Sequence, residues 1–139
     1  MSVLVDTCVL REVQHPRGNP AVRARLAALP EQDLYLSVLT VGELRKGIAK
    51  LAAGRRRREL EVWLDSILED NAGRILPVDL AVAEQWGRLT IAAEARGRPL
   101  PAIDGLIAAT ALRHGFAVMT RNTSDFQATG VELINPWEA

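Results

Sequence analysis

The stretch AIDGLIAATALRHGFAVMT, residues 102–120, decides the fold class because it joins a helical segment directly to an apolar strand. Its Ala-rich first part predicts a helix over 102–113. His114 and Gly115 are typical of a helix end, since a basic residue suits the negative pole of the helix dipole and glycine accepts a left-handed cap. The apolar run 116–120 then predicts a strand. A helix followed at once by such a strand indicates an α/β protein.

The same alternation extends outward along the whole chain. Further strands are expected at 3–5, 34–38 and 74–78, with a short fifth at 132–134, and helices are expected through Leu10 and Val13 and over 20–29, 41–53, 56–69 and 80–95. Apolar strands separated by helices predict one domain, 1–139, with a short, mostly parallel sheet of four or five strands covered by helices on both faces. Right-handed crossovers place the functional crevice of such a sheet at the carboxyl ends of its strands.

Composition limits the class of protein further. The chain has 139 residues, of which 48% are hydrophobic and 24% charged, as is usual for a soluble globular domain. The first apolar run, 3–5, is cut by Asp6 and is too short for a signal peptide, and no later run reaches membrane-spanning length. We therefore expect a cytoplasmic protein without a membrane segment. The single cysteine, Cys8, excludes an internal disulfide and any zinc site of several cysteines; we assign Cys8 no role beyond that of a small buried residue.

Charge is distributed unevenly although the total is zero. Residues 1–58 carry eleven Lys/Arg and five Asp/Glu, a net of +6, whereas residues 59–139 carry six and twelve, a net of −6. Such a chain can present a basic face that attracts an anion. Scattered, solvated charge explains the same numbers and is favoured on charge alone.

Four acids fall at the predicted carboxyl edge of the sheet. Asp6 follows the first strand, Glu43 lies in the first turn of the helix after the second strand, Asp104 lies in the first turn of the Ala-rich helix, and Asp125 lies in the loop after the fourth strand. Three have an ordinary structural alternative: Glu43 can close a capping box with Thr40, Asp104 can complement a helix dipole, and Asp125 can be a turn residue. Asp6 favours a functional role, because a carboxylate at the end of a buried strand has to be solvated, paired or coordinated.

Their convergence indicates a metal. Two carboxylates about 4 Å apart repel by roughly 4 kcal/mol at an effective dielectric near 20. A helix N-terminus stabilises each acid by only about 0.3–1 kcal/mol. A hard divalent cation, Mg²⁺ or Mn²⁺, suits such a set of oxygen ligands, and the resulting site supports phosphodiester hydrolysis. Thr7 and Thr120 can hold a water or a phosphate oxygen, and Asn122 can orient Asp125; ordinary strand-end and turn chemistry explains these three residues equally well.

Four motifs resemble those of one family, over essentially the whole chain and in the family's order. They are Leu4-Val5-Asp6-Thr7, Thr40-Val41-Gly42-Glu43-Leu44, the run from Ile103 to Ala111, and Thr120-Arg121-Asn122-Thr123-Ser124-Asp125-Phe126. The sequence is similar to PIN-domain ribonucleases, and more narrowly to VapC/FitB-like toxins of bacterial type II toxin–antitoxin pairs. The resemblance implies a three-layer α/β/α sandwich.

The resemblance also implies an activity and partners. It implies Mg²⁺- or Mn²⁺-dependent endoribonuclease activity, a homodimer, and inhibition by a cognate antitoxin that can insert a basic side chain into the acidic pocket. By this analogy Asp6, Glu43, Asp104 and Asp125 are the metal-binding, catalytic acids, and Thr120 and Asn122 support them.

Other residues leave alternatives open. Arg55, Arg56, Arg57 and Arg58 open a helix against its dipole, which suggests RNA phosphates or an antitoxin segment as a partner; a solvated basic turn neutralised by Glu59 and Glu61 is equally consistent. Lys46 and Lys50 are expected to face solvent rather than substrate, although on the basic side of the crevice. Trp63 and Trp86 occupy apolar helical positions, so we expect them to lie in the core or in a dimer interface rather than to stack on bases.

Two rival functions remain to be weighed against a nuclease. A phospho-acceptor receiver domain shares the small parallel α/β fold and an acidic pocket, but it needs an acidic pair after the first strand and a late lysine. Here Thr7 and Cys8 follow Asp6, and no lysine follows Lys50. The second rival is a PIN-fold regulatory module that binds a partner without significant nuclease activity. The sequence separates it from a nuclease only weakly, since a complete set of acids is an electrostatic burden without a metal.

Overall fold

A computed structural model describes residues 1–138 and shows a parallel sheet of five strands. The strand order is β3-β2-β1-β4-β5, and every neighbouring pair is parallel. The strands are short and match the expected positions: β1 (Val3–Val5), β2 (Leu34–Ser37), β3 (Ile75–Leu76), β4 (Ala117–Met119) and β5 (Leu133–Ile134). The predicted α/β class is confirmed, and the sheet is parallel throughout its described pairs.

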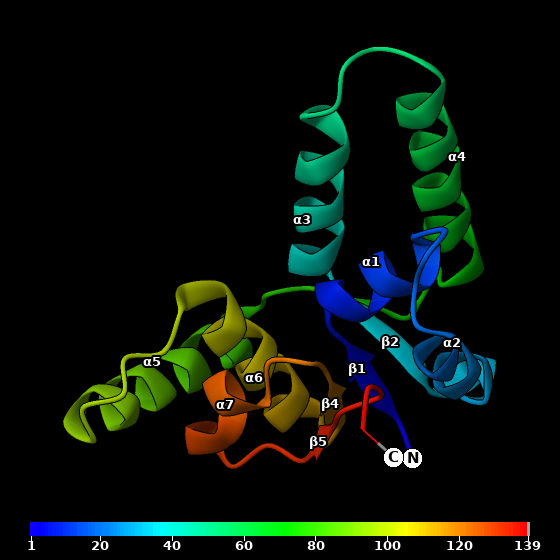
Figure 1. Cartoon of the computed structure of the whole chain (residues 1–139). Helices are drawn as coiled ribbons and strands as arrows, with labels where there is room; N and C mark the ends of the chain where they lie inside the picture. Colours follow the sequence, from blue (N-terminus) through cyan, green and yellow to red (C-terminus); the bar gives the residue numbers. More distant parts are fainter. Residues whose placement is uncertain (139) are drawn as a thin grey trace.

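Helices connect these strands and form the outer layers (Figure 1). Two short 3₁₀ turns, η1 (Glu31–Asp33) and η2 (Gln127–Thr129), precede β2 and β5. The α-helices are α1 (Thr7–Gln14), α2 (Pro20–Ala27), α3 (Val38–Ala49), α4 (Arg55–Asp70), α5 (Leu80–Ala95), α6 (Ala102–His114) and the single turn α7 (Thr123–Phe126). No helix in this described part of the chain is both long and apolar enough to cross a bilayer.

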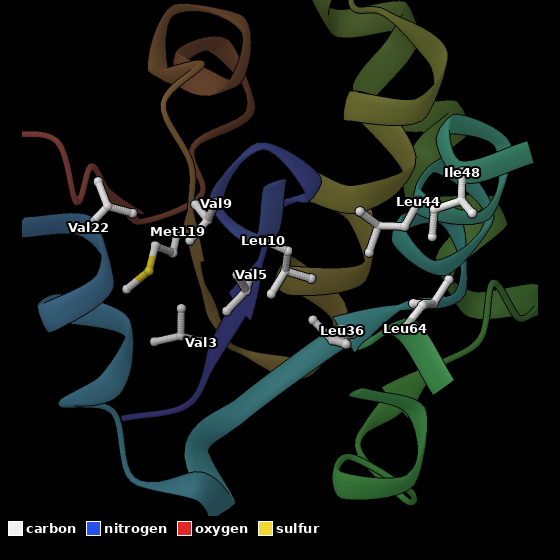
Figure 2. Close-up of a cluster of buried hydrophobic side chains, with 10 residues drawn as sticks. All are labelled: Val3, Val5, Val9, Leu10, Val22, Leu36, Leu44, Ile48, Leu64 and Met119. Carbon is white, nitrogen blue, oxygen red and sulfur yellow. The ribbon is translucent and has the colours of Figure 1, made fainter. Parts of the chain in front are cut away.

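The sheet has an apolar core on each face because successive side chains of a strand point to opposite sides. Val3 and Val5 of β1 pack with side chains of α1, α2, α3 and α4, as Figure 2 shows. Leu4, between them, packs on the other face with Ile107 of α6 and Phe126 of α7. The three-layer α/β/α sandwich is therefore confirmed, and β1 is buried on both sides at its centre.

The strand order places a topological switch point at β1. Chain connections lead from β1 to β2 on one side, while β4 arrives on the other side after α6. At such a point the loops after neighbouring strands diverge and leave a crevice at the carboxyl edge. The N-termini of α1 and α6 lie at this edge, since each helix runs back along the sheet against the strand direction.

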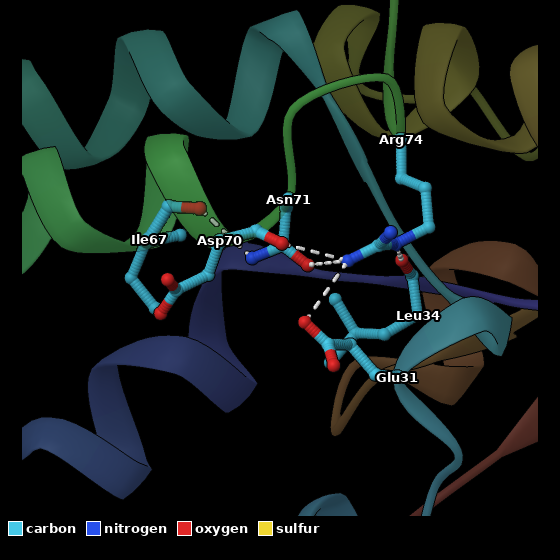
Figure 3. Close-up of polar contacts among 6 residues, drawn as sticks. All are labelled: Glu31, Leu34, Ile67, Asp70, Asn71 and Arg74. Carbon is cyan, nitrogen blue, oxygen red and sulfur yellow. Dashed lines mark hydrogen bonds and ion pairs between the residues drawn. The ribbon is translucent and has the colours of Figure 1, made fainter.

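The helices α3 and α4 form a hairpin that projects beyond the sheet, with the start of α4 at its far end (Figure 1). Arg45 of α3 reaches across to Asp65 of α4, with 3.0 Å between the guanidinium nitrogen and the carboxylate oxygen. The other end of α4 is tied to the sheet by Arg74, which donates to the carbonyls of Asp70 (2.8 Å) and Leu34 (3.1 Å) (Figure 3). The Arg74 contacts thus tie the end of the hairpin to β2, beside the edge strand β3.

Several element boundaries differ from the sequence prediction: α2 ends at Ala27 rather than 29, β3 covers only Ile75–Leu76 of the expected 74–78, and the ends of β2, β4, β5, α4 and α6 shift by a single residue. α3 begins at Val38 rather than 41, because the Ser37 hydroxyl accepts the backbone N–H of Leu39 at 3.0 Å and caps the helix. It also ends at Ala49 rather than 53. The segment after β4 forms α7 where a loop was expected. By contrast, α5 has the expected bounds, and Gly115 ends α6 in the left-handed conformation with φ of 73°.

Candidate active site

Asp6 is the most firmly held of the four predicted acids. It follows β1, its carboxylate caps α1 by accepting the N–H of Thr7 at 2.9 Å, and its second oxygen accepts the Thr120 hydroxyl at 2.8 Å. Asp6 is only 4% exposed. Burial raises the pKa of Asp6, the hydrogen bonds from Thr120 and Thr7 lower it, and the charge of Glu43 raises it, so that the pKa stays above its ordinary value.

Glu43 is brought to Asp6 by α3. The Thr7 hydroxyl donates a 2.6 Å hydrogen bond to a carboxylate oxygen of Glu43, so Thr7 bridges the two acids through its N–H and its side chain. The structural alternative for Glu43, a capping box with Thr40, is excluded. Because α3 begins at Val38, Ser37 is the cap and Glu43 lies in the second turn, from which its carboxylate reaches α1.

Asp104 lies in the first turn of α6, as predicted, and its helix packs closely on α5. A Cβ at Gly105 would lie 3.0 Å from an atom of the Trp86 indole and 3.1 Å from one of Leu100, so glycine permits this approach. Burial raises the pKa of Asp104 to about 6, and the charges of Asp6, Asp125 and Glu43 act in the same direction. The charges of the other three acids therefore all act on Asp104, which places the four acids near one another.

Asp125 is exposed and completes the set from α7. Its carboxyl shares a hydrogen bond with that of Asp104, which raises the pKa of Asp104 further. The Asn122 amide was expected to orient Asp125, but the described contacts of Asn122 run through its backbone. Its N–H donates to the Thr120 hydroxyl at 3.0 Å, and its carbonyl accepts the N–H of Asp125 at 3.1 Å. Asn122 thus holds Thr120, which in turn holds Asp6.

Cys8 lies at the site, although the sequence suggested no role for it. Its Sγ is 3.7 Å from a carboxylate oxygen of Asp6 and 3.6 Å from the Thr120 hydroxyl. Burial, with the negative charge of Asp6 as a smaller contribution, raises the pKa of the thiol. Cys8 is therefore a neutral neighbour that packs against Asp6. Its position two residues after Asp6, in the first turn of α1, was the only sequence signal for this contact.

The acids lack a basic partner in the part of the chain that the structure describes. Ion pairs there engage other carboxylates, those of Glu31, Asp33, Glu59, Glu61 and Asp65. Among the described residues, hydroxyl, thiol and backbone donors relieve part of the repulsion among Asp6, Glu43, Asp104 and Asp125, and the pKa of Asp104 stays raised. A bound cation would relieve the repulsion more completely.

The donor set fits a hard divalent cation. Within residues 1–138, no three His, Cys, Asp or Glu side chains are close enough to form a ready-made metal cage. Mg²⁺ needs none, because it keeps several waters and binds proteins through one or two carboxylates. Asp6 and Asp104 offer carboxylate oxygens at the end of β1 and the start of α6, and burial raises the pKa of both, so that a positive neighbour would favour their charged forms. These two residues suit the direct ligands, with Glu43 and Asp125 beside them.

Arg55, Arg56, Arg57 and Arg58 are not part of this site. They begin α4 at the far end of the helical hairpin (Figure 1). Arg55 pairs with Glu59 at 2.9 Å, and Arg57 pairs with Glu61 at 3.1 Å. The two glutamates thus neutralise part of the run, as the solvated alternative expected, and any partner of these arginines would bind away from the acids.

This geometry, acids gathered at the switch point of a parallel sheet, is matched by one protein family. The PIN domain family model matches residues 3–132, and the chain therefore belongs to the PIN-domain family. Among its relatives, VapC ribonuclease Y4jK of Sinorhizobium fredii is 42% identical over 98% of both chains. Toxin FitB of Neisseria gonorrhoeae is 43% identical over 97% of this chain and 98% of that protein.

A solved structure extends the likeness to three dimensions. The crystal structure of FitAcB from Neisseria gonorrhoeae superposes on this chain with a TM-score of 0.95 and 43% identity, covering 99% of both chains. The resemblance to PIN-domain and VapC/FitB proteins expected from the motifs is therefore confirmed.

Proposed function

We propose that this protein is a Mg²⁺- or Mn²⁺-dependent endoribonuclease and the toxin of a bacterial type II toxin–antitoxin pair, acting in the cytoplasm as a single PIN-like domain. The observation that carries the proposal is the gathering of four carboxylates, three of which act on Asp104, without a basic partner among the described residues. The relative named a ribonuclease, 42% identical over nearly the whole chain, supports RNA as the substrate.

The residues of the crevice have distinct tasks in hydrolysis. Asp6, held by Thr7 and Thr120, is a rigid ligand, and Glu43 is fixed beside it by the Thr7 hydroxyl. Asp104, whose carboxyl is half-buried at the start of α6, suits the second direct ligand, and an acid left unliganded beside these two can take a proton from the attacking water. A divalent cation bound here would supply Lewis-acid chemistry, lowering the pKa of water and offsetting the charge on the phosphate.

Two protein partners belong to the proposal. A cognate antitoxin is supported by the relative named Toxin FitB and by the FitAcB structure. A homodimer is supported by apolar side chains left in solvent, among them Leu80 (75% exposed) and Ile91 (68% exposed) on α5. The mass of the purified protein in solution, measured by light scattering, tests the dimer, and a monomer at all concentrations contradicts it.

Cleavage of RNA by the purified protein tests the activity. Single-stranded and structured RNAs are incubated with Mg²⁺ or Mn²⁺ and then with EDTA, alongside Asp6→Asn and Asp104→Asn proteins. We expect cleavage by the parent that stops on chelation and is lost in both variants. Cleavage without metal, or by variants as active as the parent, contradicts the mechanism. A folded parent that cuts none of the RNAs favours the regulatory-module alternative.

Growth of bacteria tests the toxin assignment separately. Expression of the parent without an antitoxin should arrest growth, whereas the Asp6→Asn protein, expressed to the same level, should not. Unimpaired growth with well-folded parent protein counts against a toxin.

A further inference from the structure

A cavity of about 360 Å³ opens beside Glu43 and runs along one side of α3. Its walls come from three helices: α3 supplies most of the lining, α1 supplies Arg11, and α6 supplies Ile103 next to Asp104. The cavity therefore adjoins the acidic crevice directly, and its contents would lie against the residues proposed to cut RNA.

The charged residues that line this cavity are mostly cations. Arg11, Lys46 and Lys50 line it, and Glu43 is its one carboxylate. All three cations are exposed, and none forms an ion pair within residues 1–138. Arg45, the neighbour of Lys46 on α3, lies outside the cavity and pairs with Asp65. We call the side of the cavity formed by Arg11, Lys46 and Lys50 the basic groove.

The two lysines follow Glu43 along one face of α3. A helix rises about 1.5 Å per residue, so Lys46 lies about 4.5 Å and Lys50 about 10.5 Å beyond Glu43 along the axis. Lys46 and Lys50 are therefore about 6 Å apart along the axis, and a nucleic-acid strand carries one negative charge at every nucleotide. The spacing suits a chain of phosphates better than a single anion.

Two glycines of α3 contribute to the wall of the cavity. Gly42 and Gly47 both line the cavity, and a Cβ at Gly42 would meet nothing within 4 Å. Glycine inside a helix costs roughly 0.5–1 kcal/mol relative to alanine, so these positions weaken α3 while leaving the groove wide. Val38 and Ile103, 40% and 39% exposed, add apolar surface at the end near the acids, where a ribose or base can pack.

We propose that the basic groove binds the phosphodiester backbone of single-stranded RNA next to the bond that is cut, with Lys46 and Lys50 contacting successive phosphates. This inference rests on the proposed nuclease function and assigns to it a substrate-binding surface. The groove favours RNA over an acidic protein segment because it combines a row of unpaired cations with apolar surface and leads into the acids that would bind the catalytic metal.

The salt dependence of RNA binding tests the assignment. Affinity for a single-stranded RNA oligonucleotide is measured by fluorescence anisotropy in EDTA, where the RNA stays intact, over a range of KCl concentrations. Each phosphate contact on a single strand contributes about 0.7 to the slope of log K against log salt. Lys46→Gln with Lys50→Gln should therefore reduce the slope by about 1.4 and weaken binding about tenfold at 0.15 M salt.

A matched control removes two cations outside the groove. Arg45→Gln with Arg88→Gln also removes two positive charges. Both arginines contact residues outside the groove, Arg45 pairing with Asp65 and Arg88 contacting Gln85. This variant should retain the slope of the parent. In Mg²⁺, the lysine variant should raise KM far more than it lowers kcat, because the lost contacts bind substrate and transition state alike.

The outcomes separate the inference from the function on which it rests. A parent that cuts RNA while the lysine variant keeps its slope and KM overturns the basic groove alone. Equal losses in the lysine and control variants also overturn it, because the effect would then be one of net charge. If the lysine variant binds RNA normally but loses affinity for the antitoxin, the groove belongs to that partner. A parent that binds and cuts no RNA overturns both proposals.

Discussion

The acidic crevice and the basic groove lie side by side but are built in opposite ways. In the crevice, Asp6 is buried and receives hydrogen bonds from Thr7 and Thr120, so its position is fixed before any ligand arrives. In the groove, Lys46 and Lys50 are exposed and unpaired within the described chain, so their ammonium groups keep their freedom. One region therefore suits precise chemistry, and the other suits adaptable binding of a polyanion.

This contrast predicts different signatures for substitutions in the two regions. Like charges held together in a partly buried site destabilise the fold until a ligand neutralises them, so loss of a carboxylate should impair activity and stabilise the protein. Solvated cations with no partner contribute little to stability, so their loss should affect binding alone.

The largest effect is expected for Asp6→Asn. The amide preserves the size of the side chain but removes the charge that would bind the metal. We expect kcat/KM for RNA cleavage to fall on the order of 10²–10⁴-fold, as for the loss of a central catalytic group. Cleavage rates measured with saturating Mg²⁺ check this. Activity within a few-fold of the parent would show that the rigid acid is not the reactive centre.

Thr120→Val tests whether the rigidity of the crevice matters. The change removes the hydroxyl that donates to Asp6 and accepts from Asn122, with little change of volume. Loss of a partner that orients a metal ligand typically costs about 10–100-fold in metal affinity, and we expect a loss in this range for Mn²⁺.

Thr110→Val is the control for that substitution. Thr110 is equally buried, but its hydroxyl donates to the carbonyl of Leu106 within α6 and touches none of the acids. Mn²⁺ affinity should therefore stay at the parent value. If both valine variants lose affinity alike, the effect is a general loss of packing and the proposed support of Asp6 fails.

Asp104→Asn should make the protein more stable above pH 6. Between the ordinary pKa of 3.8 and about 6, the folded parent holds a proton at Asp104 that the unfolded chain has lost, so its stability falls as pH rises through that window. Asparagine does not titrate, so the advantage of the variant grows from pH 4 to pH 6 and then stays constant.

The expected gain is about 1 kcal/mol once solvent screening at this half-buried carboxyl is allowed for, or about 3–5 °C in Tm. Thermal unfolding at several pH values without metal measures it, and saturating Mg²⁺ should reduce the difference by stabilising the parent. A variant less stable than the parent at pH 7 would indicate that Asp104 is structural.

The smallest effect is expected for Gly42→Ala in the wall of the basic groove. Open space surrounds the position, and its backbone is helical, so alanine should raise the free energy of unfolding by about 0.5–1 kcal/mol. Urea denaturation measures this gain. A loss of stability would show that the wall is more crowded than the structure indicates.

The sequence predicts the sheet well because its strands are buried on both faces. Val3, Leu4 and Val5 are all apolar, which predicts a strand covered on both faces, and all three are buried. Gly115 marks the end of α6 because it adopts a left-handed backbone conformation that few other residues adopt. The start of α3 was harder to predict. Val38 and Leu39 suit a strand as well as a helix. The hydrogen bond from the Leu39 N–H to the Ser37 hydroxyl caps the helix and decides between them. That error moved Glu43 from the second turn to the first.

Contacts between distant segments were the other limit. The Thr7 bridge to Glu43 joins residues 36 positions apart, and the Thr120 bond to Asp6 joins residues 114 apart. The position of these groups at the ends of strands predicts that they lie close together. It does not predict which hydroxyl donates a hydrogen bond to which carboxylate. Lys46 and Lys50 were expected to face solvent, and they are exposed, but they also line a cavity whose opposite wall comes from α1 and α6. The sequence of α3 alone does not reveal which residues of other helices lie opposite it.

Calorimetric titration of Mn²⁺ into the purified protein at pH 6 tests the central claim most directly. The account predicts that the parent binds Mn²⁺ and releases protons on binding, because a cation favours the charged form of Asp104, whose pKa is raised to about 6. The Asp6→Asn protein should bind far more weakly. No Mn²⁺ binding by the parent, or equal binding by the variant, would contradict the account.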